Sequence, residues 1–244
     1  MMRRLRRTIL SLIALAVLGL SALLLYGHGR RHPEDVPWTE LDLGRPIGLF
    51  TGRKLADLAD EGERCQRLMR RAGIAFATLP SRSAGPQCGY DHAVRFTEGG
   101  SQEIAFSPPN LGTNCAVAAA LALWEWHVVQ PAARRHFGRP VARIEHFGSY
   151  SCRRIYGRDE GAWSEHATAN AVDIAAFVLE GGRRISVLGD WADEGAEGRF
   201  LRAVRDGACD LFATVLSPDY NEAHRDHFHL DQAARGAMGW RGCR

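Results

Sequence analysis

The charge-free apolar run from Thr8 to Tyr26 constrains this chain more than any other feature. Its length suits the ~30 Å hydrocarbon core of a bilayer, and the arginine-rich stretch MMRRLRR precedes it. Because positive residues stay on the cytoplasmic side, residues after about 27 are predicted to lie outside the inner membrane, in the periplasm. The alternative is a cleaved signal peptide and a soluble periplasmic domain, although residues 22–30 offer no convincing cleavage site.

Export would place six cysteines in an oxidising compartment, where an even set predicts three disulfides. No close C-x-x-C pair of the kind that binds metals is present. Six cysteines allow fifteen connectivities, of which we take the pairing of sequence neighbours as the working prediction. The predicted pairs are Cys65 with Cys88, Cys115 with Cys152, and Cys209 with Cys243.

The charge of the exported part argues against a nucleic-acid partner. The whole chain has 31 basic and 28 acidic residues, but positions 3, 4, 6, 7, 30 and 31 are arginines in a stretch of 32 residues without an acid. The remainder is therefore slightly acidic, with no basic patch for a phosphate backbone. Nothing in the composition fixes the oligomeric state.

The chain divides into an anchor at 1–27, a linker at 28–45 and a domain at 46–244, which we expect to have an α+β fold. Apolar periodicity and capping residues predict three helices, the second divided at Pro131. Alternation and turn residues predict five strands, the first two forming a hairpin around the glycines at 99 and 100. The helices are expected at 54–71, 113–138 and 197–209, and the strands at 92–98, 102–109, 141–150, 185–191 and 226–231.

The segment NEAHRDHFHLD, residues 221–231, is rich in histidine. On a strand, alternation places His227 and His229 on one face and Phe228 on the other. An isolated H-x-H pair is weak evidence, because such pairs also occur in cores. The segment SEHATANAVD adds His166 and Asp173, and a catalytic zinc site needs three protein ligands and one open position.

These motifs resemble a known superfamily. Ser164-x-His166-x-x-Ala169-x-Ala171-x-Asp173, followed by His224-x-x-His227-x-His229, is similar to the D-Ala-D-Ala carboxypeptidase/hedgehog (LAS-type) zinc metallopeptidases, and the second spacing to their murein endopeptidase branch. GSYSCR, SEHATANAVDI, the DHFHLD segment and the final CR resemble the extensin-like C-terminal domain family of proteobacteria. This resemblance covers roughly residues 46–244.

The resemblance implies a hedgehog/DD-peptidase-like fold, in which a small antiparallel sheet with flanking helices holds one Zn²⁺. It implies His166, Asp173 and His229 as zinc ligands, His227 as base or oxyanion stabiliser, and His224 as a residue of the outer shell. Asp226 and Asp231 are near enough in sequence to orient the ligand histidines. Ala169 departs from the glycine of the superfamily motif, which puts a close turn or a substrate approach in doubt.

Three further residues have competing interpretations. Ser164 matches the serine that contacts the substrate carboxylate in the carboxypeptidase branch, and Arg153 is a candidate for the accompanying arginine or for a brace of the Cys152 loop. Glu165 is a second candidate for the catalytic base. His127, His136 and His146 lie outside both motifs and are expected to be structural or surface residues.

The predicted function is a zinc-dependent hydrolase that cleaves an amide bond in peptidoglycan peptides, as a carboxypeptidase or an endopeptidase. The alternative is a non-catalytic wall-binding or scaffold module stabilised by zinc. Retention of His227 beside three ligands favours catalysis, whereas Ala169 leaves room for its loss.

Overall fold

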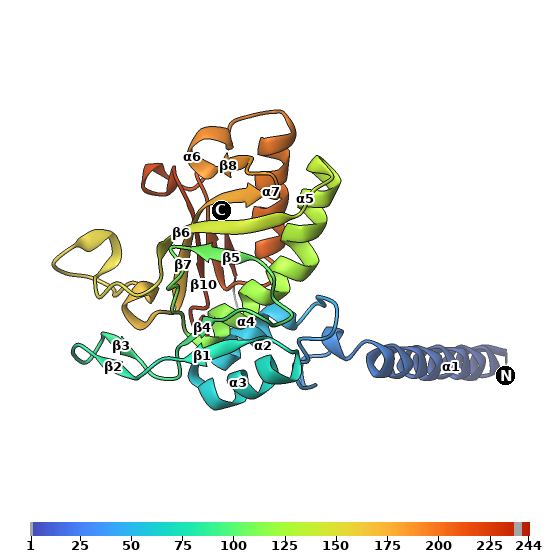
Figure 1. Ribbon diagram of the computed structural model, residues 1–244. Coiled ribbons are helices and arrows are strands. Elements are labelled where there is room, and N and C mark those ends of the chain that lie inside the picture. Colours follow the sequence, from blue (N-terminus) through green and yellow to red (C-terminus); the bar gives the residue numbers. More distant parts are fainter. Residues whose placement is uncertain (1, 237–240) are drawn as a thin grey trace.

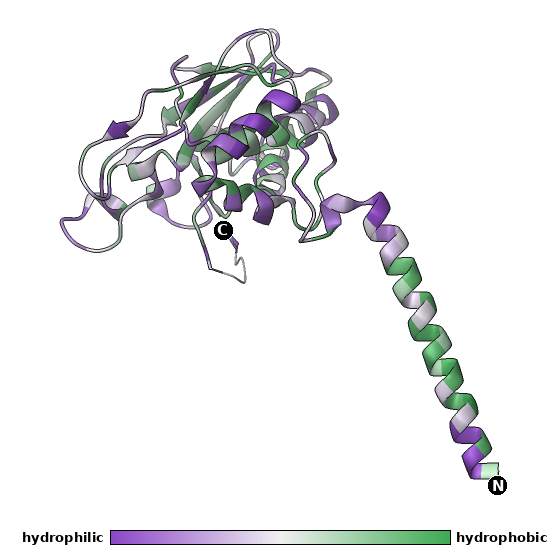
Figure 2. Cartoon of the chain, turned by 90° about the horizontal axis from the view of Figure 1, so that it is seen from below, coloured by the Kyte–Doolittle hydropathy of each residue, from purple (hydrophilic) through white to green (hydrophobic). Residues whose placement is uncertain are grey.

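The computed structural model describes residues 2–236 and 241–244. Within these residues one helix, α1 (Met2–Arg31), is long and apolar enough to cross a membrane or to serve as a signal. None of its residues is buried against the rest of the chain, and it projects away from the folded domain with a green apolar middle between polar ends (Figure 2). The domain itself is mixed α and β, as predicted.

The predicted linker at 28–45 is partly ordered against the domain. Lys54 donates to the hydroxyl of Thr39 at 2.8 Å and to the carbonyl of Pro33 at 3.1 Å. Leu41 and Leu43 are 6% and 1% exposed and belong to the main hydrophobic core. The packed domain therefore begins several residues before position 46.

A mixed sheet organises the domain (Figure 1). Among the described residues it has seven strands in the order β11-β9-β10-β7-β6-β5, with β8 beside the far half of β7. The central strand pairs are antiparallel, whereas β5 runs parallel to β6 at one edge and β11 runs parallel to β9 at the other. The small antiparallel sheet that was expected is therefore only the middle of a larger mixed sheet. Its strands are β5 (Ala105–Ser107), β6 (Val141–Gly148), β7 (Ala171–Leu179), β8 (Arg184–Ser186), β9 (Thr214–Leu216), β10 (Phe228–Asp231) and β11 (Gly242–Cys243).

Helices cover one face of this sheet. The asparagine at 114 caps α4 by accepting from the N–H of Ala116 at 2.9 Å, and the alanine-rich sequence that follows favours a helix. A π-helical segment, Glu125–Val129, separates α4 (Cys115–Trp124) from α5 (Gln130–Phe137), with Pro131 in the first turn of α5. The predicted helix is thus divided, but by a π-helical segment that ends two residues before Pro131.

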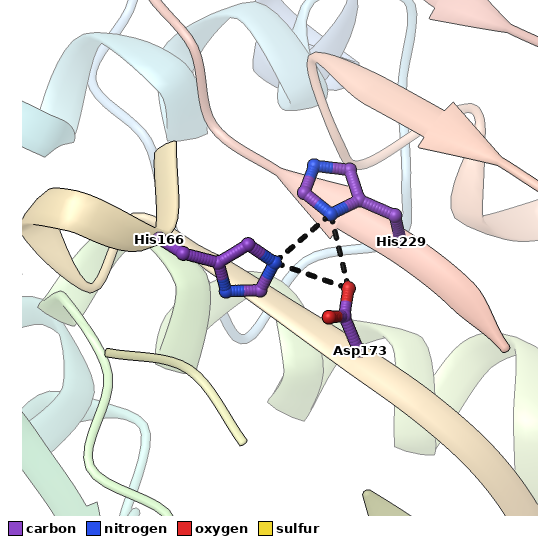
Figure 3. Close-up of side chains that lie close together, drawn as sticks. All are labelled: His166, Asp173 and His229. Atoms are coloured by element: carbon purple, nitrogen blue, oxygen red, sulfur yellow. Dashed lines mark hydrogen bonds and ion pairs between the residues drawn. The ribbon is translucent and has the colours of Figure 1, made fainter. Parts of the chain in front are cut away.

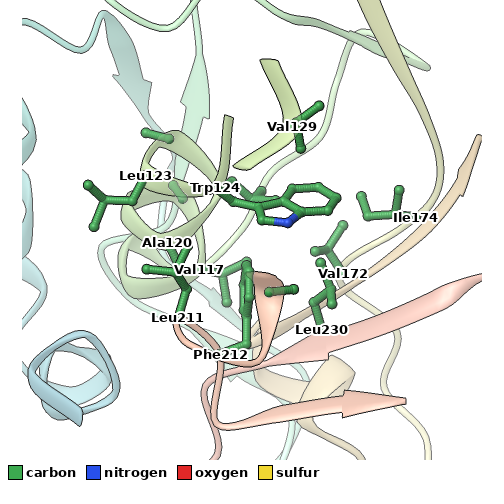
Figure 4. Packing of buried hydrophobic residues seen from close by; sticks show 14 of the residues in the cluster. Val117, Ala120, Leu123, Trp124, Val129, Val172, Ile174, Leu211, Phe212 and Leu230 are labelled. Atoms are coloured by element: carbon green, nitrogen blue, oxygen red, sulfur yellow. The ribbon is translucent and has the colours of Figure 1, made fainter. Parts of the chain in front are cut away.

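The core lies between the helices and β7. The indole of Trp124 donates to the carbonyl of Val204 in α7 (Ala196–Ala208) at 2.8 Å and meets Phe177 of β7 edge-on. Ile174 and Leu230 point toward the same cluster from neighbouring strands (Figure 4). Burial of these large side chains, at roughly 25 cal/mol per Å², is the main driving force that fixes the sheet against the helices.

Four predicted elements, one helix and three strands, are wrong in their extent or pairing. The segment 54–71 is two helices, α2 (Thr51–Ala56) and α3 (Gly62–Arg71), joined by a 3₁₀ turn. The segments at 92–98 and 102–109 do not form a hairpin, because β4 (Val94–Phe96) pairs with β1 (Phe76–Thr78) and β5 pairs with β6. The segment 185–191 is strand only as far as Ser186, whose hydroxyl then caps the short helix α6 (Val187–Asp190).

Three disulfides form, but two of the predicted pairs are wrong. Cys65 of α3 bonds to Cys115 at the start of α4, and Cys88 bonds to Cys152, while the Cys209–Cys243 pair is as predicted. Pairing each cysteine with its neighbour in sequence failed, because the packing of α3 on α4 determines the first disulfide. The second ties the hairpin of β2 (Arg82–Ser83) and β3 (Gly89–Tyr90) to the loop after β6.

Candidate functional site

Sheet register places two of the predicted ligands together. Asp173 of β7 and His229 of β10 are direct cross-strand partners in an antiparallel pair. The neighbours of His229, Phe228 and Leu230, are fully buried in the core, so alternation turns His229 away from the helices. Asp173 is turned the same way, because Ile174 beside it enters the core. The predicted strand alternation at 226–231 is confirmed from Phe228 onward.

The third residue comes from a turn that precedes β7. His166 lies on a 3₁₀ turn, Glu165–Thr168, and its N–H donates to the hydroxyl of Ser164 at 3.3 Å. Ala169 ends the turn in the left-handed region, with φ 55°, and its carbonyl accepts from the N–H of Asn114 at 2.7 Å. The chain thus makes the tight turn with alanine, where the superfamily motif that it resembles has glycine. The left-handed conformation costs a residue with a Cβ atom ~1 kcal/mol or more.

Three polar atoms converge on one point (Figure 3). The Nε2 atom of His166 lies 3.1 Å from Oδ1 of Asp173 and 3.1 Å from Nδ1 of His229, and the last two atoms are 3.0 Å apart. In a tetrahedral zinc site with bonds of ~2.0–2.1 Å, ligand atoms are ~3.3 Å apart. The triangle is therefore close to the size that a tetrahedrally coordinated cation requires, and histidine nitrogen and carboxylate oxygen are ligand atoms that zinc binds.

The opposite nitrogen of each histidine is held by an acceptor. Nδ1 of His166 donates to the carbonyl of Ser149 at 2.5 Å, and Nε2 of His229 donates to the carboxylate of Asp231 at 3.1 Å. Asp231 is itself held by the N–H of Ala233 at 3.0 Å. In the neutral form of each ring these bonds select the tautomer in which the converging nitrogen carries a lone pair, as metal-binding histidines require.

The electrostatics of the cluster favour a positive charge. Burial opposes ionisation of Asp173, but hydrogen bonds from His166 and His229 outweigh it and hold the pKa of that carboxyl well below its usual range. Burial lowers the pKa of His229, but its bonds to Asp173 and Asp231 raise that pKa to about 9. Without a metal, a proton on His229 is therefore stabilised where a cation would otherwise lie.

Two more histidines border the cluster. His227 donates from Nδ1 to Asp226 at 2.8 Å, which leaves its Nε2 facing inward, 3.6 Å from Oδ1 of Asp173. His224 bonds to the amide oxygen of Asn221 at 2.7 Å and lies beside the ring of His227. Burial and the neighbouring imidazoles lower the pKa of His224 to about 4, so it stays neutral near pH 7.

A cleft of about 810 Å³ brings these residues to the surface. Of the ten residues selected from the sequence, only Asp226 does not line it; Asp226 supports His227 from behind. Arg153 lines the cleft on an exposed loop, and Glu165 accepts from the side-chain amide of Asn170 at 2.7 Å. Burial raises the pKa of Glu165. The nine cleft-lining residues are Arg153, Ser164, Glu165, His166, Asp173, His224, His227, His229 and Asp231.

Sequence reasoning missed several residues of this site. Ser149 lies within the GSYSCR motif, but it acts through its backbone carbonyl, which no pattern of side chains indicates. Tyr156, Trp163 and Tyr220 form aromatic walls of the cleft, and the hydroxyl of Tyr156 accepts from Asn221 at 2.9 Å. These aromatics come from loops, where periodicity carries no signal.

The fold and the site define a disulfide-bonded α+β domain with a His–Asp–His cluster suited to a metal ion, set in an open cleft. A family model described as Extensin-like protein C-terminus matches residues 63–244, three quarters of the chain. This protein therefore belongs to the extensin-like C-terminal family. No curated protein and no solved structure matches it.

Proposed function

We propose that this protein is a zinc-dependent hydrolase that cleaves an amide bond in peptidoglycan peptides at the periplasmic face of the inner membrane. The observation that carries the proposal is the convergence of His166, Asp173 and His229 within 3.1 Å of one another, in a cleft that His227 also lines. The apolar α1 supports the location. The arginines before it orient the domain outward, where wall peptides are the abundant amide substrate.

The metal would be held by Nε2 of His166, the carboxylate of Asp173 and Nδ1 of His229. A zinc ion bound there would polarise the scissile carbonyl and lower the pKa of a water ligand toward neutrality. The protein contributes fixed geometry, because Ser149 and Asp231 orient the two imidazoles before any ion arrives. That pre-organisation raises affinity and leaves the cleft side of the cluster open to solvent and substrate.

His227 is placed to move the proton. Its Nδ1–H is tied to Asp226, so the lone pair of Nε2 faces the cluster and can accept a proton from the attacking water. The same nitrogen can then give that proton to the departing amine. Asp226 would stabilise the imidazolium that exists between these two steps.

Ser164 and Arg153 are suited to substrate positioning. The hydroxyl oxygen of Ser164 accepts from the N–H of His166, while its own hydrogen is left to donate into the cleft. Arg153 has no ion-pair partner among the described residues and lines the cleft near Ser164. We propose that its guanidinium binds a carboxylate of the peptide, a pairing whose planar geometry favours arginine.

Glu165 is the competing candidate for the base. Burial raises its pKa, but its carboxylate is engaged by Asn170, and the structure gives it no contact with the three converging atoms. Glu165→Gln separates the two assignments. If His227 is the base, this variant keeps most of the turnover, whereas His227→Ala loses it.

The full-length protein in detergent, incubated with muropeptides with and without a chelator, tests the function by mass spectrometry of the products. We expect His166→Ala and Asp173→Ala to lose zinc, and His227→Ala to keep zinc and lose turnover. His127→Ala, an exposed histidine outside the cleft, is the control and should match the wild type. Zinc binding without cleavage of any muropeptide or sacculus would favour the scaffold alternative, and no zinc binding would refute both.

A further inference from the structure

A second cavity, of about 290 Å³, lies next to the candidate site. Asp226 contributes to its wall and holds the Nδ1–H of His227 at 2.8 Å. Because His227 lines the large cleft, the cleft and this cavity adjoin at the Asp226–His227 pair. The other residues that line it include Glu145, Phe147, Ala175, Arg184, Ser186 and Leu188.

The cavity continues the surface on which the cluster lies. Asp173 and Ala175 are two residues apart on β7, and Ile174 between them is fully buried in the core. Ala175 lines the cavity, so the cavity begins two residues, or ~7 Å, along the strand from Asp173. The small side chain of Ala175 fills little of the space beside the cluster.

A β-bulge directs an apolar side chain to the boundary. The register between β6 and β7 shifts between His146 and Gly148, which leaves Phe147 as an extra residue in β6, and the shift before His146 leaves Ala175 without a partner on β6. Bulges of this kind re-aim side chains and are frequent beside active sites. Phe147 is 62% exposed and meets the ring of His227 edge-on at 5.7 Å. Across the cavity, Leu188 of α6 is 64% exposed.

The chemistry of the cavity suits a short piece of peptide. Two exposed apolar side chains form its rim, and its polar groups include the ion pair of Arg184 with Glu145 at 2.8 Å. A volume of about 290 Å³ is at the lower end for ligand pockets, enough for a residue or two. A substrate that reaches the cluster from the cleft would meet this cavity next if its chain continued past the scissile bond.

We infer that this cavity is the subsite for the part of the substrate beyond the scissile amide, and hence that the substrate is an internal amide of crosslinked peptides rather than a terminal residue. The inference rests on the proposed hydrolase function. In the reaction, water adds its oxygen to the acyl carbon, the C–N bond breaks, and the nitrogen leaves as an amine with the proton returned by His227. Both products are then chains, one in the cleft and one in the cavity.

The test compares two substrates on the zinc-loaded full-length protein in detergent: a crosslinked muropeptide dimer and a single stem peptide with a removable terminal residue. We expect the dimer to have the higher kcat/KM. Leu188→Ala should raise KM for the dimer by about threefold to tenfold with little change in kcat, because only apolar contact is lost. Phe147→Ala should raise KM as well. Leu49→Ala, which removes a leucine that is 73% exposed elsewhere, should leave both substrates unchanged.

Equilibrium binding of the dimer to the zinc-free protein separates failure of the subsite from failure of the hydrolase. Cleavage of the terminal residue alone, or a dimer KM that Leu188→Ala does not change, would overturn the subsite and leave the hydrolase standing. Dimer binding that Leu188→Ala weakens, without cleavage by the zinc-loaded protein, would support the subsite and refute the hydrolase. Absence of both binding and cleavage would refute both.

Discussion

The strand half and the turn half of the candidate site are held by different means. Asp173 and His229, the strand half, face each other because β7 and β10 pair in one register, and core residues on either side prevent a slip. His166, the turn half, depends on a cap, a carbonyl acceptor and a neighbouring disulfide-bonded loop. Sheet periodicity is thus enough to hold two residues of the cluster, whereas the third needs several local supports.

Removal of the disulfide nearest the turn half should change stability more than any other variant proposed below. Cys88→Ser with Cys152→Ser opens a link across 64 residues, which the chain-entropy model values at about 4 kcal/mol of unfolding free energy. Cys152 follows Ser149 by three residues, so zinc affinity should fall too. Denaturant unfolding and zinc titration measure both effects. Unchanged stability and unchanged affinity would mean that the turn half does not need this loop.

A second prediction concerns pH and the strand half. In the metal-free protein the pKa of His229 is raised to about 9 from 6.5. Protonation therefore contributes stability that is fully present below about pH 6.5 and is lost as the pH rises through 9. Zinc must displace this proton, so its apparent affinity at pH 7 should be roughly a hundredfold below the high-pH limit. Competition with a chromophoric chelator between pH 6 and 8 checks this, and a flat profile would contradict it.

The third prediction removes the charge that orients His229. Asp231→Asn weakens the acceptor of the Nε2–H bond, and such changes typically reduce metal affinity by about 10- to 100-fold. Asp226→Asn is the matched control, because Asp226 orients His227, which we do not assign as a ligand. It should lower turnover and spare zinc affinity. Equal losses of affinity in both variants would place His227 among the ligands.

A smaller effect is expected at the cap of the turn half. Ser164→Ala removes the oxygen that accepts from the N–H of His166, and loss of such a cap costs about 1 kcal/mol. Ser151→Ala, at an exposed serine of the adjoining loop, should cost less than half of that. Chemical denaturation of the full-length protein compares the two. Equal effects would show that the hydroxyl of Ser164 does not hold the turn.

The smallest effect is expected at Ala169. Glycine would remove the steric cost of the left-handed backbone conformation. It would also remove a fully buried methyl group worth ~0.8 kcal/mol and raise the conformational entropy of the unfolded chain. These contributions nearly cancel, so Ala169→Gly should change stability by less than about 1 kcal/mol and zinc affinity by less than about threefold. A large gain in zinc affinity would show that alanine distorts the turn half.

Local sequence predicted the features that depend on local physics. The alanine-rich stretch indicated α4, Pro131 lies close to the division before α5, and the alternation in DHFHLD indicated the face of His229. Prediction from local sequence failed where pairing depends on residues far apart in the chain. β4 and β5 pair with β1 and β6 rather than with each other, and Cys65 finds Cys115 through helix packing.

The candidate site shows the same limit. β7 was not recognised as a strand, because AVDIAAFVL is apolar on both faces and lacks alternation. The support that the carbonyl of Ser149 gives to His166 has no side-chain signature. The motif spacing therefore indicated the residues that meet, but only tertiary structure shows what holds them in place.

Zinc K-edge X-ray absorption on the wild type and on His227→Ala distinguishes the proposed ligands from the proposed base. We expect two imidazole ligands with oxygen completing the shell, from His166, His229 and Asp173, and the same spectrum in the variant. A third imidazole in the wild type that disappears in His227→Ala, or fewer than two imidazoles in the wild type, would contradict this assignment of the metal site.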